Sequence, residues 1–96
     1  KEYEVHRAPD GQEAIEKYAS CRPDMILMDI KMPVMDGLEA TRRIRLKGGT
    51  LPIIALTANA YDSDRDKAFE AGCDDYMAKP IMAPALREMI KKYFGE

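Results

Sequence analysis

Short apolar runs alternate with longer amphipathic segments along this chain. Met25–Met28, Ile53–Leu56 and Tyr76–Ala78 are mostly apolar and are bounded by proline, glycine or polar residues. Runs of this length and character are typical of strands that are buried on both faces of a parallel sheet. Tyr3–Arg7 is a weaker candidate for one more strand near the start of the chain.

An amphipathic or polar segment with helix signals follows each predicted strand. Asp10 is a candidate N-cap for the first helix, and Gly48 and Gly72 are placed to end the second and third. Leu86–Phe94 carries its apolar residues at helical spacing. The order β-α-β-α-β-α-β-α predicts an α/β fold, a doubly wound parallel sheet with right-handed crossovers and helices on both faces.

Polar residues end three of the predicted strands. Asp29 follows Met25–Met28, Thr57 follows the next strand, and Lys79 follows the last. The carboxyl ends of parallel strands meet at one edge of a sheet, which is where open α/β folds carry their chemistry. An acid, a hydroxyl and an ammonium group at one edge suit a carboxylate that accepts a phosphoryl group.

Size, charge and cysteine content narrow the possible number of domains, the partners and the cellular location. The 96 residues suffice for one small domain, 1–96. A net charge of −2 gives no reason to expect nucleic acid or a membrane surface as a partner, and no apolar run approaches the ~20 residues of a membrane span. Cys21 and Cys73 match no metal-ligand spacing, which favours reduced thiols in a cytoplasmic protein.

Three segments, in this order and spacing, resemble the receiver domain of two-component response regulators: Met28–Gly37, Ala55–Ala58 and Ala71–Pro80. The resemblance covers essentially the whole chain. It implies a flavodoxin-like sheet with the strand order 2-1-3-4-5. It also implies a phosphoacceptor module of a two-component phosphorelay.

The resemblance assigns roles to four residues of the predicted sheet. Asp29 matches the phosphoacceptor, Thr57 the hydroxyl that follows the phosphoryl group, and Lys79 the lysine that pairs with a phosphoryl oxygen. Tyr76 matches the aromatic residue whose rotamer reports the switch, although a tyrosine in a strand is also common as an ordinary core residue.

Further implied roles fall on the loops after the strands. The backbone carbonyl of Lys31 matches a Mg²⁺ ligand that acts together with Asp29. The side chains of Lys31 and Asn59 match positions that tune phosphoryl lifetime. The bond from Lys79 to Pro80 matches one that is usually cis in the family.

One departure from the family pattern is large. The family begins with a strand that ends in an acidic pair, followed by a helix, and this chain begins at what resembles the second strand. Asp74 and Asp75 precede their strand, so we expect them at the opposite end of the sheet. Mg²⁺ binding should therefore be weak, and Tyr3–Arg7 and Met25–Met28 should each expose an unpaired edge, which favours a homodimer.

Three functions remain open from the sequence. The leading one is a signalling module, not an enzyme beyond self-catalysed phosphoryl chemistry, whose partner is a histidine kinase or phosphotransfer domain; it could be part of a hybrid histidine kinase. The second is a phosphorylation-silent interaction or dimerisation domain. The third is a haloacid-dehalogenase-type phosphatase, but those enzymes usually need Asp-x-Asp, and Asp29-Ile30-Lys31 lacks the second acid.

Overall fold

The computed structural model describes residues 3–29, 35–57, 62–79 and 81–95. Strands and helices alternate throughout, as the sequence predicts. The elements are β1 (Val5–Ala8), α1 (Gly11–Cys21), β2 (Met25–Asp29), α2 (Met35–Leu46), β3 (Ile53–Thr57), α3 (Asp62–Ala71), β4 (Asp75–Ala78) and α4 (Ala83–Phe94). Among the helices so described, none has both the length and the apolar character needed to cross a membrane.

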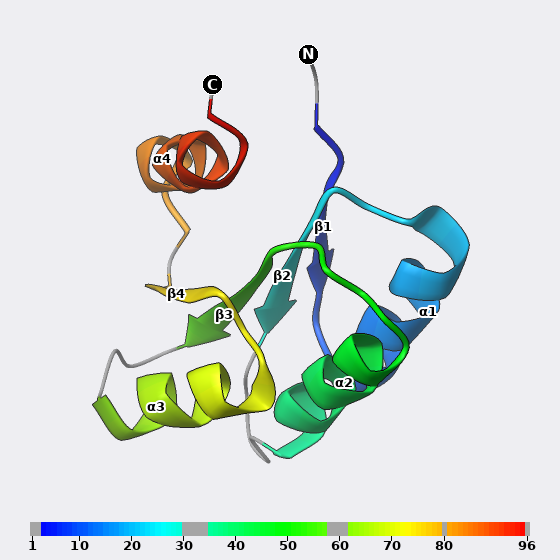
Figure 1. Cartoon of the computed structure of the whole chain (residues 1–96). Helices are drawn as coiled ribbons and strands as arrows, with labels where there is room; N and C mark the ends of the chain where they lie inside the picture. Colours follow the sequence, from blue (N-terminus) through cyan, green and yellow to red (C-terminus); the bar gives the residue numbers. More distant parts are fainter. Residues whose placement is uncertain (1–2, 30–34, 58–61, 80, 96) are drawn as a thin grey trace.

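The sheet has four strands in the order β1-β2-β3-β4, and all three pairings are parallel. Helices α1, α2 and α3 cover one face, and α4 lies on the other (Figure 1). The predicted parallel sheet with helices on both faces is therefore confirmed.

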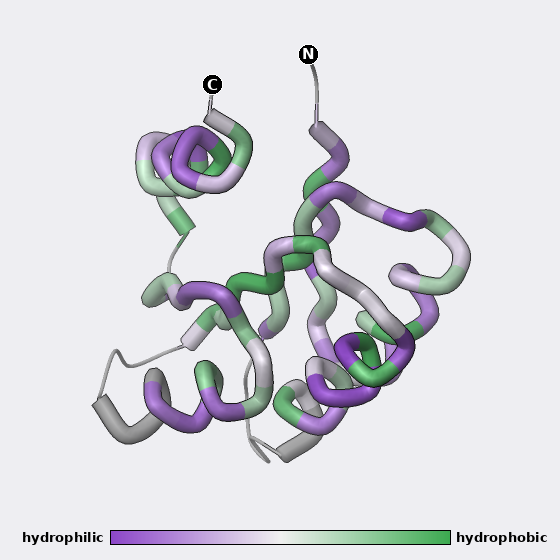
Figure 2. The backbone as a smooth tube through the Cα atoms, in the orientation of Figure 1, coloured by the Kyte–Doolittle hydropathy of each residue, from purple (hydrophilic) through white to green (hydrophobic). Residues whose placement is uncertain are grey.

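Alternate residues of the central strands enter two separate cores, because side chains along a strand point to opposite faces. Ile26 and Met28 of β2 pack with α1, α2 and α3, whereas Met25 and Leu27 pack toward α4. Figure 2 shows the central strands among the most apolar parts of the chain. Burial on both faces explains why these strands are nearly continuous apolar runs.

The prediction that the first two strands each expose an unpaired edge is wrong for β2. β1 pairs directly with β2, with Val5 opposite Met25 and Ala8 opposite Met28, so β2 lies inside the sheet. The physical reason is that unpaired backbone N–H and C=O groups on a buried strand cost free energy, and the pairing satisfies them. Only the outer side of β1 remains an edge at this end of the described sheet.

Arg45 joins two loops at the amino end of the sheet. Its guanidinium donates to the carbonyl oxygens of Gly72, Gly49 and Leu51 at 2.9, 3.1 and 2.8 Å, and its Nη2 lies 2.7 Å from Asp74 Oδ2. The same Asp74 oxygen accepts a hydrogen bond from a backbone N–H at the start of β3. This network holds the starts of β3 and β4 side by side.

Asp75, at the start of β4, holds α4 in place. Its Oδ2 accepts from Lys92 Nζ at 2.6 Å and from the Tyr93 hydroxyl at 3.1 Å, and its Oδ1 accepts from the Tyr76 N–H. Burial acts to raise the pKa of Asp75, but these partners outweigh it and lower the pKa. Burial, together with the nearby Asp75 charge, raises the pKa of Tyr93 to about 12.

Candidate functional site

Asp29, Thr57 and Lys79 meet at the carboxyl edge of the sheet, as their strand-end positions predict. Asp29 is the last residue of β2 and Thr57 the last of β3. Lys79 directly follows β4, and its backbone N–H donates to the Thr57 carbonyl at 2.8 Å. Parallel pairing of three strands thus brings these residues, distant in sequence, to one edge.

Asp29 is a buried carboxylate between two cations. Its side chain is 6% exposed, Lys79 Nζ lies 2.5 Å from Oδ1, and Arg7 Nη2 lies 3.2 Å from Oδ2. The Lys79 ammonium and the Asp29 carboxylate form an ion pair. Burial alone acts to raise the pKa of Asp29, but the pairing with Lys79 and Arg7 outweighs it and holds the pKa below its usual value. Asp29 is therefore ionised at neutral pH, which suits a nucleophile.

Thr57 places a buried hydroxyl at this edge of the sheet. Its side chain is 4% exposed, and within the described residues its Oγ1 has no hydrogen-bond partner. A buried hydroxyl normally finds a partner, because leaving it unsatisfied costs free energy. An unpaired donor at the same sheet edge as a buried carboxylate is suited to an oxygen that arrives with a ligand.

Sequence reasoning missed Arg7. Arg7 lies in β1 opposite Leu27, two positions before Asp29, so both side chains project from the same face of the sheet. The signal was present, because Arg7 closes the predicted strand Tyr3–Arg7 in the way that Asp29 follows its own strand. The contact between Arg7 and Asp29 was not expected because the family pattern places another strand between β1 and β2.

Tyr76 lies in β4 opposite Ala55 and is half-buried against the core beneath α3. Its ring contacts Phe69 of α3 edge-on, with centroids 6.4 Å apart. Lys31, Asn59 and Pro80 lie outside the described residues, so their implied roles stay predictions.

The described residues alone supply a poor ligand set for a Mg²⁺ ion. Magnesium prefers octahedral oxygen ligands that usually include one or two carboxylates. Within the part of the chain that the structure describes, no three His, Cys, Asp or Glu side chains are grouped for a metal. Asp29 already has a cation on each oxygen. Asp74 and Asp75 lie at the start of β4, where Asp75 is opposite Ile54, so they are at the opposite end of the sheet as expected.

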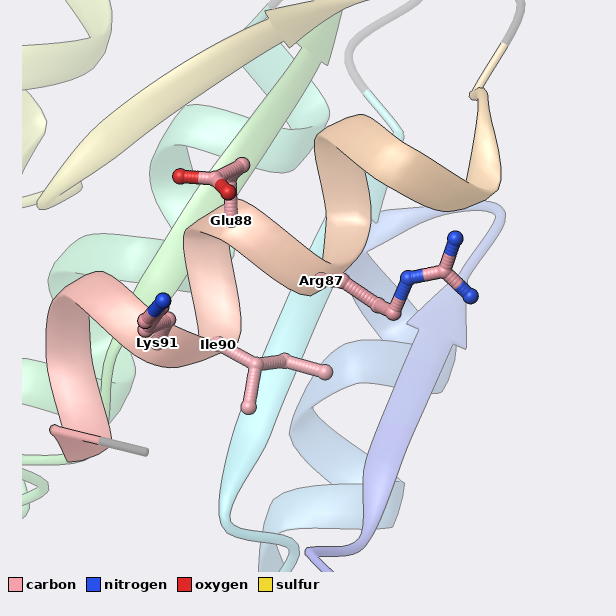
Figure 3. A pocket seen from close by; sticks show the side chains of 4 residues that line it. All are labelled: Arg87, Glu88, Ile90 and Lys91. Atoms are coloured by element: carbon pink, nitrogen blue, oxygen red, sulfur yellow. The ribbon is translucent and has the colours of Figure 1, made fainter.

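A surface pocket of about 370 Å³ lies on α4 and is lined by Arg87, Glu88, Ile90 and Lys91 (Figure 3). All four lining residues come from one helix. None of the strand-end residues lines it, so its position gives it no part in the chemistry of Asp29.

Comparison with known proteins places this arrangement in a family. The family model "Response regulator receiver domain" matches residues 1–91. The chain is 46% identical over 93 residues to hybrid signal transduction histidine kinase G of Dictyostelium discoideum, covering 94% of this chain. It spans only 3% of that kinase, and 38% of several response regulators that it also matches.

Solved structures share the fold. The receiver domain of sensor histidine kinase PA1611 from Pseudomonas aeruginosa, which holds a magnesium ion in its active site cleft, matches with a TM-score of 0.81, 33% identity and full coverage of both chains. The receiver domain of the response regulator Ssk1 from Saccharomyces cerevisiae, solved with the histidine phosphotransfer protein Ypd1, matches with a TM-score of 0.80 and 26% identity, covering 97% of this chain and 91% of that one.

The flavodoxin-like fold that the resemblance implies is thereby confirmed. Neither of these solved structures is a phosphatase, and no relative named above favours that alternative. The chain belongs to the response regulator receiver domain family, the phosphoacceptor modules of two-component phosphorelays.

Proposed function

We propose that Asp29 is the phosphoacceptor of this receiver domain and that its donor is the phosphohistidine of a histidine kinase or a histidine phosphotransfer domain. The observation that carries the proposal is the buried Asp29 carboxylate, which lies between Lys79 and Arg7 at the sheet edge where Thr57 has a hydroxyl without a partner among the described residues. Phosphoryl transfer depends on a positioned nucleophile and on charges that stabilise the equatorial oxygens, and Asp29 with its neighbouring cations can supply both.

The chemical step is a displacement at phosphorus. One Asp29 oxygen attacks the phosphorus atom, an acyl phosphate P–O bond forms, and the P–N bond to the donor histidine breaks. The bond electrons leave on the imidazole, which takes a proton and departs neutral. Lys79 Nζ offers a charge for the equatorial oxygens, where negative charge spreads during transfer.

Thr57 and Tyr76 form the proposed switch. Once a phosphoryl group is attached to Asp29, its oxygens offer the acceptor that the Thr57 hydroxyl lacks. Movement of Thr57 toward that group frees space at the end of β3. Tyr76, on the neighbouring strand and in contact with Phe69, then changes rotamer and alters the surface that α3 and β4 present.

The proposal also covers the domain organisation, the cellular location, the partners and the metal binding of this chain. Residues 1–96 belong to one receiver domain, of which they lack the first strand and helix, and this domain works in the cytoplasm, in agreement with the free thiols of Cys21 and Cys73. Its partner is a kinase or phosphotransfer domain, with no nucleic acid or membrane contact of its own. The outer edge of β1 is the place for pairing with a second copy. Mg²⁺ binds weakly, and Lys31 and Asn59 adjust the lifetime of the acyl phosphate.

The domain acts as an acceptor and not as an enzyme that turns over a separate substrate. Any catalysis is of its own phosphorylation and dephosphorylation. The silent-domain alternative predicts that no phosphoryl group is added. The phosphatase alternative predicts repeated hydrolysis of an aryl phosphate.

Intact-mass analysis after incubation with phosphoramidate separates these functions. We expect one added phosphoryl group on the wild-type chain and none on the Asp29→Asn variant. The Asp24→Asn variant, which alters a carboxylate that accepts from the Glu4 N–H instead, is the matched control and should be labelled like the wild type. Equal labelling of Asp29→Asn and the wild type would reject the assignment.

A further inference from the structure

Two exposed apolar side chains lie on neighbouring helices of the same sheet face. Leu46, the last residue of α2, is 87% exposed, and Phe69 of α3 is 43% exposed. Both helices cover the same face of the sheet (Figure 1). Arg45 Nε of α2 donates to the carbonyl oxygen of Gly72, directly after α3, at 2.9 Å, so the C-terminal ends of the two helices lie together.

The surroundings of Leu46 are basic. Arg42 and Arg43 lie one turn before it on α2, and both are exposed. Residues three and four apart are neighbours on the surface of a helix. The two guanidiniums share one acid, Glu39, at 3.9 and 3.2 Å, so positive charge remains in excess beside Leu46. We call Arg42, Arg43 and Leu46 the basic patch.

The surroundings of Phe69 are acidic. Asp66 and Glu70 lie beside it on α3, and both are exposed. Lys67 adds an exposed cation nearby, but residues 62–71 together have four acidic and two basic side chains. We call Asp66, Phe69 and Glu70 the acidic patch. An exposed apolar side chain with charged neighbours is thus present on each helix, and the excess charge has opposite signs.

We propose that two copies of this chain form a symmetric dimer in which the basic patch of each copy contacts the acidic patch of the other. In a two-fold interface each surface meets its counterpart on the partner, so both contacts form at once. Leu46 of one copy packs against Phe69 of the other, and opposite charges surround this contact. The surface is separate from the outer edge of β1 and from Asp29, so the proposal does not depend on phosphorylation.

The size of the patches sets the strength of the dimer. Stable interfaces bury about 1,200–2,000 Å² in total, and two small patches per copy bury less. We therefore expect a weak dimer, with a Kd on the order of 0.1 mM at low salt. Because exposed charges contribute to the contact, added salt should weaken it further.

Charge reversal with sedimentation equilibrium tests the proposal. The double variant Arg42→Glu/Arg43→Glu makes both patches acidic, and Asp66→Lys/Glu70→Lys makes both patches basic. We expect each variant alone to dimerise at least about tenfold more weakly than the wild type, because like charges then face each other. An equimolar mixture of the two variants should regain the dimer, since every acidic patch again meets a basic one.

Leu46→Gln tests the apolar part of the contact, and Met82→Gln is its matched control. Met82 is also an exposed apolar residue, at 60%, but it lies outside both patches. We expect Leu46→Gln to weaken the dimer about three- to tenfold and Met82→Gln to leave it unchanged.

Four results would each overturn the proposal. They are a wild-type chain that stays monomeric at about 1 mM, charge-reversed variants that dimerise like the wild type, a mixture that regains no dimer, and equal effects of Leu46→Gln and Met82→Gln. Persistent dimerisation of the charge-reversed variants would place the contact elsewhere, for example at the edge of β1. No arm needs phosphorylation, so these results are separate from the phosphoramidate test of Asp29.

Discussion

Lys79 Nζ lies 2.5 Å from Asp29 Oδ1, and this ion pair links the ends of β4 and β2 across the end of β3. The two strands are not neighbours in the sheet, so the pair spans the strand end that carries Thr57. In this state the Asp29 carboxylate is the partner of Lys79. A phosphoryl group on Asp29 would take over that role, which couples the state of the acceptor to the segment after β4.

Lys79→Gln should slow phosphorylation of Asp29 by about two orders of magnitude, because one preorganised charge near the transferring group is lost. The rate of phosphoryl incorporation from phosphoramidate, followed by intact mass, measures the effect. Lys47→Gln removes the same charge elsewhere and should leave the rate unchanged. Equal rates for the two variants would show that Lys79 has no part in transfer.

Thr57→Val should stabilise the fold while impairing the switch. Thr57 Oγ1 is buried without a partner in the described structure, and such a group costs about 1–3 kcal/mol. Valine has nearly the same shape and no hydroxyl to satisfy. We therefore expect the free energy of unfolding in urea to rise by about 1 kcal/mol, and phosphorylation-induced shifts of the Tyr76 amide signal to shrink.

Thr41→Val is the control for this comparison. Thr41 is also fully buried in a regular element, but its Oγ1 donates to the Gly37 carbonyl at 3.0 Å. Its replacement should lower the free energy of unfolding by about 1 kcal/mol. If both valine variants are destabilised alike, the Thr57 hydroxyl has a partner in solution and the account of the switch is wrong.

The strand-end residues could be predicted because the local pattern of apolar and polar residues marks where each strand ends. Apolar runs that stop at Asp29 and Thr57 define both the strands and their carboxyl ends, and parallel pairing then requires the ends to meet. Gly72, with φ of +113°, ends α3 as expected because glycine adopts this conformation without strain.

The contact between Arg7 and Asp29 could not be predicted because it depends on which strands are neighbours. Apolar periodicity specifies a strand but not its partner, and the family pattern placed another strand between β1 and β2. The cost of unpaired backbone groups favours the closed sheet, and that closure brings the guanidinium to the carboxylate.

Arg45→Met should destabilise the fold far more than a change at the neighbouring Arg43. Arg45 donates to three carbonyl oxygens and pairs with Asp74, so its loss leaves several half-buried acceptors unsatisfied. We expect a loss of about 2–3 kcal/mol in the free energy of unfolding.

Arg43→Met tests whether that loss is specific. Among the described residues, the Arg43 side chain forms an exposed pair with Glu39, one turn away on α2, and such pairs contribute about 0.3–0.5 kcal/mol. Urea unfolding of both variants measures the difference. Similar losses would mean that the Arg45 network contributes no more than a surface ion pair.

Asp75→Asn should loosen α4 in a pH-dependent way. Because the pKa of Asp75 is lowered in the folded state, its charged form stabilises the fold above its ordinary value of 3.8, and this stabilisation is lost as the pH falls through the folded-state pKa. At pH 7 we expect the variant to lose about 1–2 kcal/mol, since the contacts from Lys92 and Tyr93 weaken. The gap to the wild type should close below the folded-state pKa. Glu88→Gln, an exposed change on α4, should show no such gap, and a gap for Asp75→Asn that is constant from pH 7 to pH 2 would contradict the role of the Asp75 charge.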